Sequence, residues 1–228
     1  MAFQIKSAII FLMKTFPSLS YEIDLWQKGF VVIGIDEVGR GAFAGPLFVG
    51  GVVFKPTTVG KQITKLLSYG INDSKKVTPQ RRKVLSEIIH KECLTSHISS
   101  ISVAQINRVG IGKATFTAMR DVVKNLREKL SSEKTFVLVD GFYIKYLRNI
   151  GLKNQQGIVG GDGISLSIAA ASIIAKVARD NHMENLSAKF PSYKWEENKG
   201  YGTLKHRIAL KQNGATPLHR KDFIENFI

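Results

Sequence analysis

The chain has 228 residues, 44% hydrophobic and 22% charged, which excludes the composition of a disordered protein. Lysine and arginine number 33 against 18 acidic residues, a net charge of +15 that favours nucleic acid as a partner over an anionic membrane surface or a merely well-solvated exterior. The lone cysteine, Cys93, excludes a disulfide framework and a cysteine-rich zinc site, and fits a reducing, cytoplasmic setting.

Residues 1–29 are expected to form an N-terminal extension ahead of a catalytic domain at residues 30–228. The apolar run at residues 8–13 is followed by Lys14, so it falls short of the roughly 18 apolar residues of a membrane helix. It is also too short for the apolar core of a signal peptide. We expect an amphipathic lead-in, with Met13 as an alternative start, and no membrane partner.

The first half of the chain alternates strand and helix patterns. Residues 31–35 are rich in β-branched side chains, which is typical of a buried strand, and residues 47–54 predict a second strand. Thr78 and Pro79 suit the N-cap and first position of a helix. Its apolar positions, and those of a later helix, are Val84, Leu85, Ile88 and Ile89, then Phe116, Met119, Val122, Val123 and Leu126.

The remaining pattern continues this alternation. Strands alternating with helices predict an α/β fold, with a central mixed sheet flanked by helices and a helical C-terminal part. The further expected elements are strands at residues 97–101, 136–139 and 157–159, and helices at residues 113–129, 165–189 and 203–213, the last capped by Thr203 and ended by Gly214.

Four carboxylates stand where strands end or where a helix begins. Asp36 and Glu37 follow the first strand, Asp140 follows a later strand, and Asp162 precedes the long helix. Ligand sites of α/β sheets form at such strand ends. Neighbours within a strand face opposite ways, so Asp36 and Glu37 can serve one site only if the strand breaks there. The turn at residues 39–41 is expected to supply that break.

A carboxylate cluster without clustered histidine or cysteine suits a hard cation, Mg²⁺ or Mn²⁺, better than zinc. Like charges held together are unfavourable unless a cation neutralises them. Two such ions can activate water and stabilise the leaving oxygen in phosphodiester hydrolysis. Each carboxylate taken alone is more simply explained as a surface charge or a helix cap.

Several blocks of sequence together carry a specific resemblance. Across about residues 31–224 the chain is similar to bacterial ribonuclease HII, of the type 2 ribonuclease H family, and the blocks occur in the order of that family. The blocks are residues 34–41 (GIDEVGRG), 44–46 (AGP), 72–76 (NDSKK), 139–141 (VDG), 161–162 (GD), 167–180 (SIAAASIIAKVARD), 199–203 (KGYGT) and 216–220 (TPLHR).

The resemblance implies a ribonuclease H-like fold and roles for particular residues. It implies that the four carboxylates bind two Mn²⁺ or Mg²⁺ ions during catalysis. Tyr201, exposed by its flanking glycines, would stack on the deoxyribose that follows the ribonucleotide. The other implied substrate contacts are Gly39, Arg40 and Gly41 at the junction ribonucleotide, Lys75 and Lys76 at phosphates, and Ser172, Lys176 and Arg179 on one helix face that meets DNA.

Bland explanations remain for several of these residues. A lysine pair such as Lys75 and Lys76 is often a solvated turn, and Ser172 in an alanine-rich stretch often serves close packing. His219 is expected to be structural or phosphate-adjacent rather than a general base. Two departures from the family pattern are Gly160, where a lysine is usual, and Asn198, where a histidine is common. The first is expected to loosen the loop that holds Asp162 or to weaken a phosphate contact.

The implied activity is a monomeric, metal-dependent endoribonuclease. It would cut the RNA strand of RNA–DNA hybrids and incise duplex DNA 5′ of single ribonucleotides, leaving a 3′-hydroxyl and a 5′-phosphate. Ribonuclease HIII fits less well, because it normally has a larger N-terminal domain and lysine in place of Arg40. The rivals from other classes are a catalytically silent nucleic-acid-binding protein and a membrane-surface protein anchored by residues 1–14.

Overall fold

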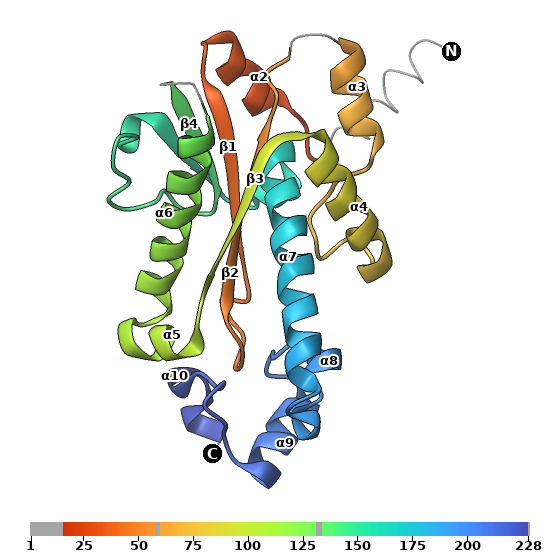
Figure 1. Ribbon diagram of the computed structural model, residues 1–228, viewed down its shortest axis with the longest axis vertical. Coiled ribbons are helices and arrows are strands. Elements are labelled where there is room, and N and C mark those ends of the chain that lie inside the picture. Colours follow the sequence, from red (N-terminus) through yellow and green to blue (C-terminus); the bar gives the residue numbers. More distant parts are fainter. Residues whose placement is uncertain (1–15, 58–59, 131–133, 228) are drawn as a thin grey trace.

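Five strands form one mixed sheet at the centre of the molecule, in the order β3-β2-β1-β4-β5 (Figure 1). The computed structural model describes residues 16–57, 60–130 and 134–227. β1 pairs antiparallel with β2 and parallel with β4, which is parallel to β5. The strands are β1 (Val31–Val38), β2 (Leu47–Phe54), β3 (Cys93–Ile101), β4 (Thr135–Asp140) and β5 (Gln155–Ile158).

Helices cover both faces of this sheet, which confirms the predicted α/β class (Figure 1). The helices are α2 (Ser20–Gln27), α3 (Gly60–Ser68), α4 (Pro79–Glu92), α5 (Val103–Val109), α6 (Ile111–Lys129), α7 (Leu166–Ser187), α8 (Trp195–Asn198), α9 (Leu204–Asn213) and α10 (Lys221–Ile224), with short 3₁₀ turns η1 (Leu152–Asn154), η2 (Gly161–Gly163), η3 (Pro191–Tyr193) and η4 (Glu225–Phe227).

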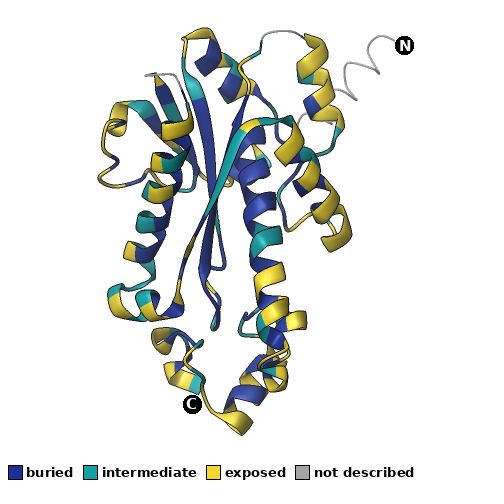
Figure 2. Ribbon diagram, in the orientation of Figure 1, coloured by how far each residue is buried: buried dark blue, intermediate teal, exposed yellow. Residues whose placement is uncertain are grey.

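Two apolar layers hold the sheet between its helices. On one face, α7, α4 and α2 pack over residues such as Val32 and Leu138. On the other face, α6 and α5 pack over Ile33 and Ile35. Helix α7 comes close to the sheet because Gly34 and Gly50 have no side chain there. A Cβ at either position would overlap the α7 backbone. Figure 2 shows the buried N-terminal half of α7 lying against the strands.

The C-terminal part forms a smaller cluster beyond the end of the sheet. It contains η3, α8, α9 and α10, with Trp195 completely buried among Tyr193, Met183 and Leu210. Asn107 of α5 joins this cluster to the sheet, because its side chain donates to the carbonyl of His219 (3.3 Å) and accepts from the amide of Lys221 (3.0 Å). The predicted helical C-terminal part is therefore confirmed.

Part of the expected N-terminal extension contributes to the core. Leu19, Leu25 and Trp26 pack in the α7 layer. The completely buried Glu22 accepts hydrogen bonds from the hydroxyl groups of Ser165 (2.6 Å) and Ser167 (2.7 Å) at the start of α7. Residues 19–26 therefore share the core of the domain that was expected to begin at residue 30. The predicted lead-in at residues 8–13 and the rival anchor at residues 1–14 lie outside the described residues.

Several elements differ from their sequence predictions. β3 begins at Cys93, earlier than predicted, while α2, α3 and α5 were not predicted. Val84, predicted to face inward from α4, is 46% exposed. The caps at Thr78 and Thr203 are confirmed, since each hydroxyl accepts from a backbone amide of the first turn. Within the described ranges, no helix combines the length and apolar composition needed to span a membrane.

Candidate active site

Asp36 and Asp140 lie side by side on neighbouring parallel strands. Ile35 of β1 is registered with Val139 of β4, so each carboxylate is one residue beyond that pair. Ile35 and Val139 face the α6 layer, and strand alternation turns the two carboxylates toward α7. The two acids therefore lie close together, although Asp36 stands within β1 and not at its end as expected.

Asp162 reaches the same place from η2, immediately before α7. The backbone amide of Gly161 donates to the Asp140 carboxylate (2.7 Å), which ties the η2 turn to the end of β4. A Cβ on Gly161 would lie 2.7 Å from Ile168 and 3.4 Å from the Asp140 carboxylate. Glycine at this position therefore permits the approach of the loop that presents Asp162.

One carboxylate oxygen from each of Asp36, Asp140 and Asp162 lies within 4.8 Å of the other two. Burial raises the pKa of Asp36 well above its usual value, with further contributions from Asp140 and Glu37. Burial also raises the pKa of Asp162, and the neighbouring Asp73 and Asp140 add to this shift. Buried, mutually repelling oxygens are the donor set that a hard divalent cation neutralises. The three residues therefore fit a Mg²⁺ or Mn²⁺ site.

Glu37 lies beside this group rather than within it. The expected strand break does not occur, because Glu37 and Val38 still pair with Val49 and Phe48 of β2. Strand alternation directs the Glu37 side chain away from Asp36, yet Asp140 and Lys75 are near enough to influence its pKa. Its carboxylate lies 3.4 Å from the Arg40 guanidinium. Burial raises the pKa of Glu37, and Arg40 partly offsets that shift.

The loop before α4 brings charge to the other side of the cluster. Lys75, whose side chain is 80% exposed, places Nζ 3.7 Å from the Asp162 carboxylate. Asp73 faces Asp162 and caps its own loop by accepting from the amide of Lys75 (2.9 Å). Asp73 belongs to the block at residues 72–76 but was not predicted as a site residue. Lys76 is exposed beside Gly163.

Two buried arginines hold the turn at residues 39–46. Arg179 donates to the carbonyls of Pro46 (3.1 Å) and Ala44 (3.2 Å), and Arg220 donates to those of Arg40 (2.8 Å) and Gly45 (2.9 Å). Gly39 has φ of +88°, and a Cβ there would overlap the Arg179 guanidinium. Arg40 and Gly41 remain exposed at the tip of the turn.

Ser172 and Arg179 do not lie on a DNA-facing surface, so the prediction for these two residues is wrong. Ser172 is 2% exposed and Arg179 is completely buried. The Ser172 hydroxyl donates to that of Ser74 (2.9 Å), behind the lysine-bearing loop. The packing alternative for Ser172 is the one that the structure favours. Lys176, with its side chain 16% exposed, is the member of the predicted set that reaches the surface.

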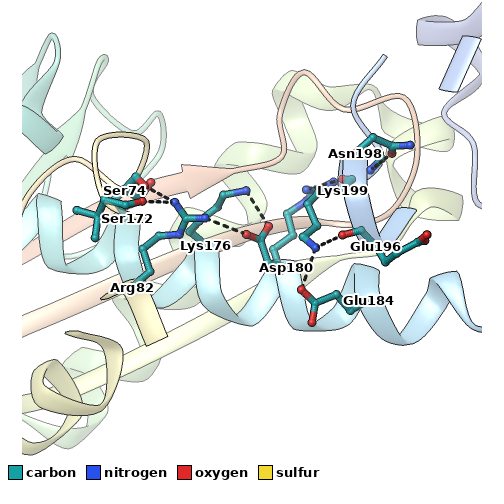
Figure 3. A network of polar contacts seen from close by, with 12 residues as sticks. Ser74, Arg82, Ser172, Lys176, Asp180, Glu184, Glu196, Asn198 and Lys199 are labelled. Carbon is teal, nitrogen blue, oxygen red and sulfur yellow. Dashed lines mark hydrogen bonds and ion pairs between the residues drawn. The ribbon is translucent and has the colours of Figure 1, made fainter. Parts of the chain in front are cut away.

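A series of polar contacts follows α7 from Ser74 and Ser172 to the C-terminal cluster (Figure 3). Arg82 of α4 donates to the carbonyl of Ser74 (2.7 Å) and lies 3.5 Å from the Asp180 carboxylate. Asp180 also accepts from Lys176 (2.7 Å). Further along, the Lys199 ammonium donates to Glu184 (2.8 Å). The network thus joins the lysine-bearing loop to the segment that carries Tyr201.

Tyr201 lies half-exposed over this network, with its ring centroid 5.2 Å from the Arg179 guanidinium carbon and 5.8 Å from Lys176 Nζ. Its flanking glycines serve packing rather than exposure. A Cβ on Gly200 would overlap the carbonyl of Ala44, and one on Gly202 would overlap the ring of Phe43. The expectation that these glycines expose the tyrosine is therefore wrong in its reason, although the ring does reach solvent.

The two departures from the family pattern are well accommodated. Gly160 adopts φ of +66° in open space, and its carbonyl accepts from the Gly163 amide (2.9 Å). Glycine adopts this conformation without strain, and its carbonyl helps to close the loop before Asp162. Asn198 accepts from the amide of Gly200 (2.8 Å) and donates to the carbonyl of Tyr193 (2.7 Å). Asn198 therefore fixes the turn that leads to Tyr201.

Converging carboxylates from β1, β4 and the η2 turn, with the exposed Lys75 beside them, form the arrangement of a metal-dependent nuclease. A family model described as Ribonuclease HII matches residues 33–226. Ribonuclease HII of Caldicellulosiruptor bescii is 40% identical over 211 residues, which is 91% of this chain and 95% of that protein. The corresponding protein of Clostridium acetobutylicum is 41% identical over 208 residues, or 91% of this chain and 78% of that protein.

Among solved structures, the complex of PCNA and RNase HII from Archaeoglobus fulgidus matches with a TM-score of 0.68 and 26% identity, covering 85% of this chain and 94% of that chain. The chain belongs to the ribonuclease HII family, with its ribonuclease H-like fold. It is therefore a metal-dependent endoribonuclease of the class that cleaves the RNA strand of RNA–DNA hybrids.

Proposed function

We propose that this enzyme also incises duplex DNA immediately 5′ of a single embedded ribonucleotide, leaving a 3′-hydroxyl and a 5′-phosphate. The observation that carries the proposal is the turn at residues 39–46, fixed by the buried Arg179 and Arg220 next to the carboxylate cluster. A rigid, glycine-containing backbone beside the scissile position can recognise one 2′-hydroxyl without requiring a long hybrid. The role that follows is ribonucleotide excision repair, by a monomer in the cytoplasm.

The carboxylates provide the metal-binding part of this activity. Asp36, Asp140 and Asp162 would hold the cations, while Glu37 and Asp73 flank them. Two Mg²⁺ or Mn²⁺ ions bound there would supply Lewis-acid activation of water and stabilisation of the leaving oxygen. The amide of Gly161 orients the Asp140 carboxylate by donating a 2.7 Å hydrogen bond to it.

The remaining residues would position the strand that is cut. Arg40, with 55% of its side chain exposed, is placed to pair with a phosphate next to Glu37. Gly39 and Gly41 would present backbone groups to the 2′-hydroxyl, and the half-exposed Tyr201 would pack against the following sugar. Lys75 and Lys76 would contact phosphates on the other side of the cluster. Lys176 lies beneath the Tyr201 ring and would add a cation there.

The test is cleavage of an end-labelled DNA duplex that carries one ribonucleotide, with Mg²⁺, Mn²⁺ or EDTA. We expect metal-dependent incision at the single position 5′ of the ribonucleotide and no cleavage of an all-DNA duplex. Cleavage of long hybrids alone would overturn the junction proposal while leaving the family activity intact.

A matched pair of variants separates catalysis from binding. Asp140→Asn should abolish incision but retain duplex binding, because it removes a charge from the cluster without changing side-chain size. Asp24→Asn, which alters an exposed carboxylate paired with Lys28 on α2, should cleave like the unmodified enzyme. Duplex binding without incision, equal in the unmodified protein and in Asp140→Asn, would instead support a catalytically silent binding protein.

A further inference from the structure

Residues 141–154, between β4 and β5, turn apolar side chains inward and aromatic and basic side chains outward. Ile144, Leu147 and Ile150 are buried in the α6 layer. An aromatic ring between them, that of Tyr146, is 87% exposed. The segment lies beside α6 and is largely exposed (Figures 1 and 2). Its other outward residues are Phe142, Tyr143, Lys145, Arg148, Lys153 and one aliphatic residue, Leu152.

The segment is held in a defined conformation despite its exposure. The buried Gln155 side chain accepts from the amide of Ile144 (2.7 Å) and donates to the carbonyls of Ile144 and Gly151 (both 3.1 Å). Tyr146 and Asn149 adopt φ of +56° and +62°, a region that residues other than glycine rarely occupy. Such strain persists where the surroundings enforce it, and it clusters at functional sites.

Between this segment and α6 lies a basic groove of about 800 Å³, which we call the α6 groove. Arg127 and Arg148, on opposite walls, have no carboxylate within ion-pair distance among the described residues, and Arg127 Nε is buried without a hydrogen-bond partner. Glu128 is an acidic residue of the lining, 4.0 Å from Lys124. The lining includes four cations and an exposed ring, which are Arg120, Lys124, Arg127, Arg148 and Tyr146.

We propose that the α6 groove binds a single strand of nucleic acid, with phosphates on its arginines and an unpaired base stacked on Tyr146. Basic grooves lined with exposed aromatic rings bind single strands in this way, since every unpaired base has a face to stack. A duplex hides those faces, and an acidic peptide would leave the exposed ring of Tyr146 without a role. The groove adjoins α6, whereas Asp36 and Asp140 face α7. It is therefore a second nucleic-acid contact, separate from the proposed incision site.

The first test is fluorescence anisotropy with a labelled oligothymidylate of about 20 nucleotides, which spans several of the sites that single-strand grooves provide. Tyr146→Ala should weaken binding roughly fivefold or more, while Tyr146→Phe keeps the ring and should bind normally. Arg127→Ala combined with Arg148→Ala should also reduce the salt slope of binding by roughly 1.4, since two phosphate contacts are lost from a single strand. The charge-matched control is Lys55→Ala with Lys61→Ala, two exposed lysines outside the groove.

A second test locates the strand. An oligonucleotide carrying 5-iododeoxyuridine should cross-link on irradiation to a peptide within residues 141–154, and Tyr146→Ala should remove that cross-link. Incision of a short, blunt duplex should be unchanged in all groove variants. Failure of the groove proposal is therefore distinguishable from failure of the proposed incision activity. The proposal would be overturned if the Tyr146→Ala and double-arginine variants bound the oligonucleotide as tightly as the lysine control does. If the groove variants lost binding to polyglutamate but kept their binding to the oligonucleotide, the proposal would be overturned in favour of an acidic protein partner.

Discussion

The Nε2 atoms of His206 and His219 lie 3.2 Å apart, and their neighbours determine which atom carries the proton. Trp195 Nε1 donates to His206 Nε2 (3.2 Å), and the Thr216 amide donates to His219 Nδ1 (2.9 Å). His219 must therefore donate from Nε2, and His206 donates from Nδ1 to the carbonyl of Tyr201 (2.9 Å). Two neutral imidazoles thus form a directional chain that ends at the backbone of Tyr201.

This chain makes stability depend on pH. Burial, helped by His206, lowers the pKa of His219 from 6.5 to about 4. As pH falls below 6.5, the unfolded chain takes up a proton that the folded His219 refuses, so folding stability is lost progressively down to about pH 4. We expect His219→Gln to destabilise the protein at neutral pH, and the gap from the unmodified protein to shrink by roughly 1 to 2 kcal/mol across that interval.

Urea unfolding at a series of pH values measures this gap directly. His90→Gln provides the control, because His90 is an exposed residue of α4 whose replacement should leave the pH dependence unchanged. If the difference in unfolding free energy between His219→Gln and the unmodified protein stayed constant with pH, this would contradict a neutral His219 in the folded protein.

Replacement of Arg179 by lysine tests the support of the turn at residues 39–46. The guanidinium donates to the carbonyls of Pro46, Ala44 and Lys199 at once, and an ammonium group cannot reach all three. We expect a loss of about 2 to 4 kcal/mol in unfolding free energy, because buried carbonyls lose their donors. Arg108→Lys, at an exposed position of α5, should cost almost nothing; equal losses in both variants would refute a turn-holding role.

Gly39 and Gly160 offer a comparison between two left-handed glycines. Gly160→Ala should cost roughly 1 kcal/mol, the price of a side chain at positive φ, since nothing lies within 4 Å of its Cβ. Gly39→Ala adds an overlap with the Arg179 guanidinium, so it should cost several-fold more and impair incision of the single-ribonucleotide duplex. Thermal unfolding with kcat/KM for each variant gives the comparison. Similar losses in both would mean that the Arg179 contact is not rigid.

Local chemistry explains what the sequence predicted well. The strand at residues 47–54 and the caps at Thr78 and Thr203 depend on neighbours along the chain, and each lies where it was expected. The pairing of Asp36 with Asp140 was predictable because parallel strands bring their ends to one edge. These features require only periodicity, side-chain branching and capping preferences.

Contacts between distant segments explain what the sequence did not predict. Gly200 packs on Ala44, and Arg179 supports the turn that contains it, so neither role is visible in either segment alone. The position of Glu37 depends on how far β1 continues, and the pairing of β1 with β2 determines that length. Helix α2 has a buried Glu22 as its partner for α7, and a single acidic residue in an extension gave no sign of that contact.

Glu22→Gln is expected to raise stability at high pH and to leave it unchanged at low pH. Burial raises the pKa of Glu22, so the folded protein holds this proton above the pH at which the unfolded chain releases it, and stability falls as pH rises through that interval. Glutamine keeps an oxygen to accept from Ser165 and Ser167 without carrying a charge. At about pH 8 the variant should be more stable by roughly 1 kcal/mol, and below the unfolded pKa it should gain nothing. Chemical denaturation at both pH values checks this; a uniform loss would mean that the charged form is preferred.

Asp36→Asn tests whether the carboxylate cluster trades stability for metal binding. The carboxylate is buried beside Asp140 and Asp162, so at about pH 8 with EDTA its replacement should stabilise the protein by roughly 1 to 2 kcal/mol. Mg²⁺ or Mn²⁺ should stabilise the unmodified protein by about 2.7 kcal/mol at a concentration near 100 times Kd, and the variant far less. The readout is urea unfolding with and without each ion, with Asp24→Asn as the control that should respond like the unmodified protein. The expected gain in EDTA and the expected loss of metal stabilisation both arise from the same three converging carboxylates. If Asp36→Asn were less stable in EDTA and were stabilised by metal as much as the unmodified protein, Asp36 would be neither destabilised by its neighbours nor a metal ligand.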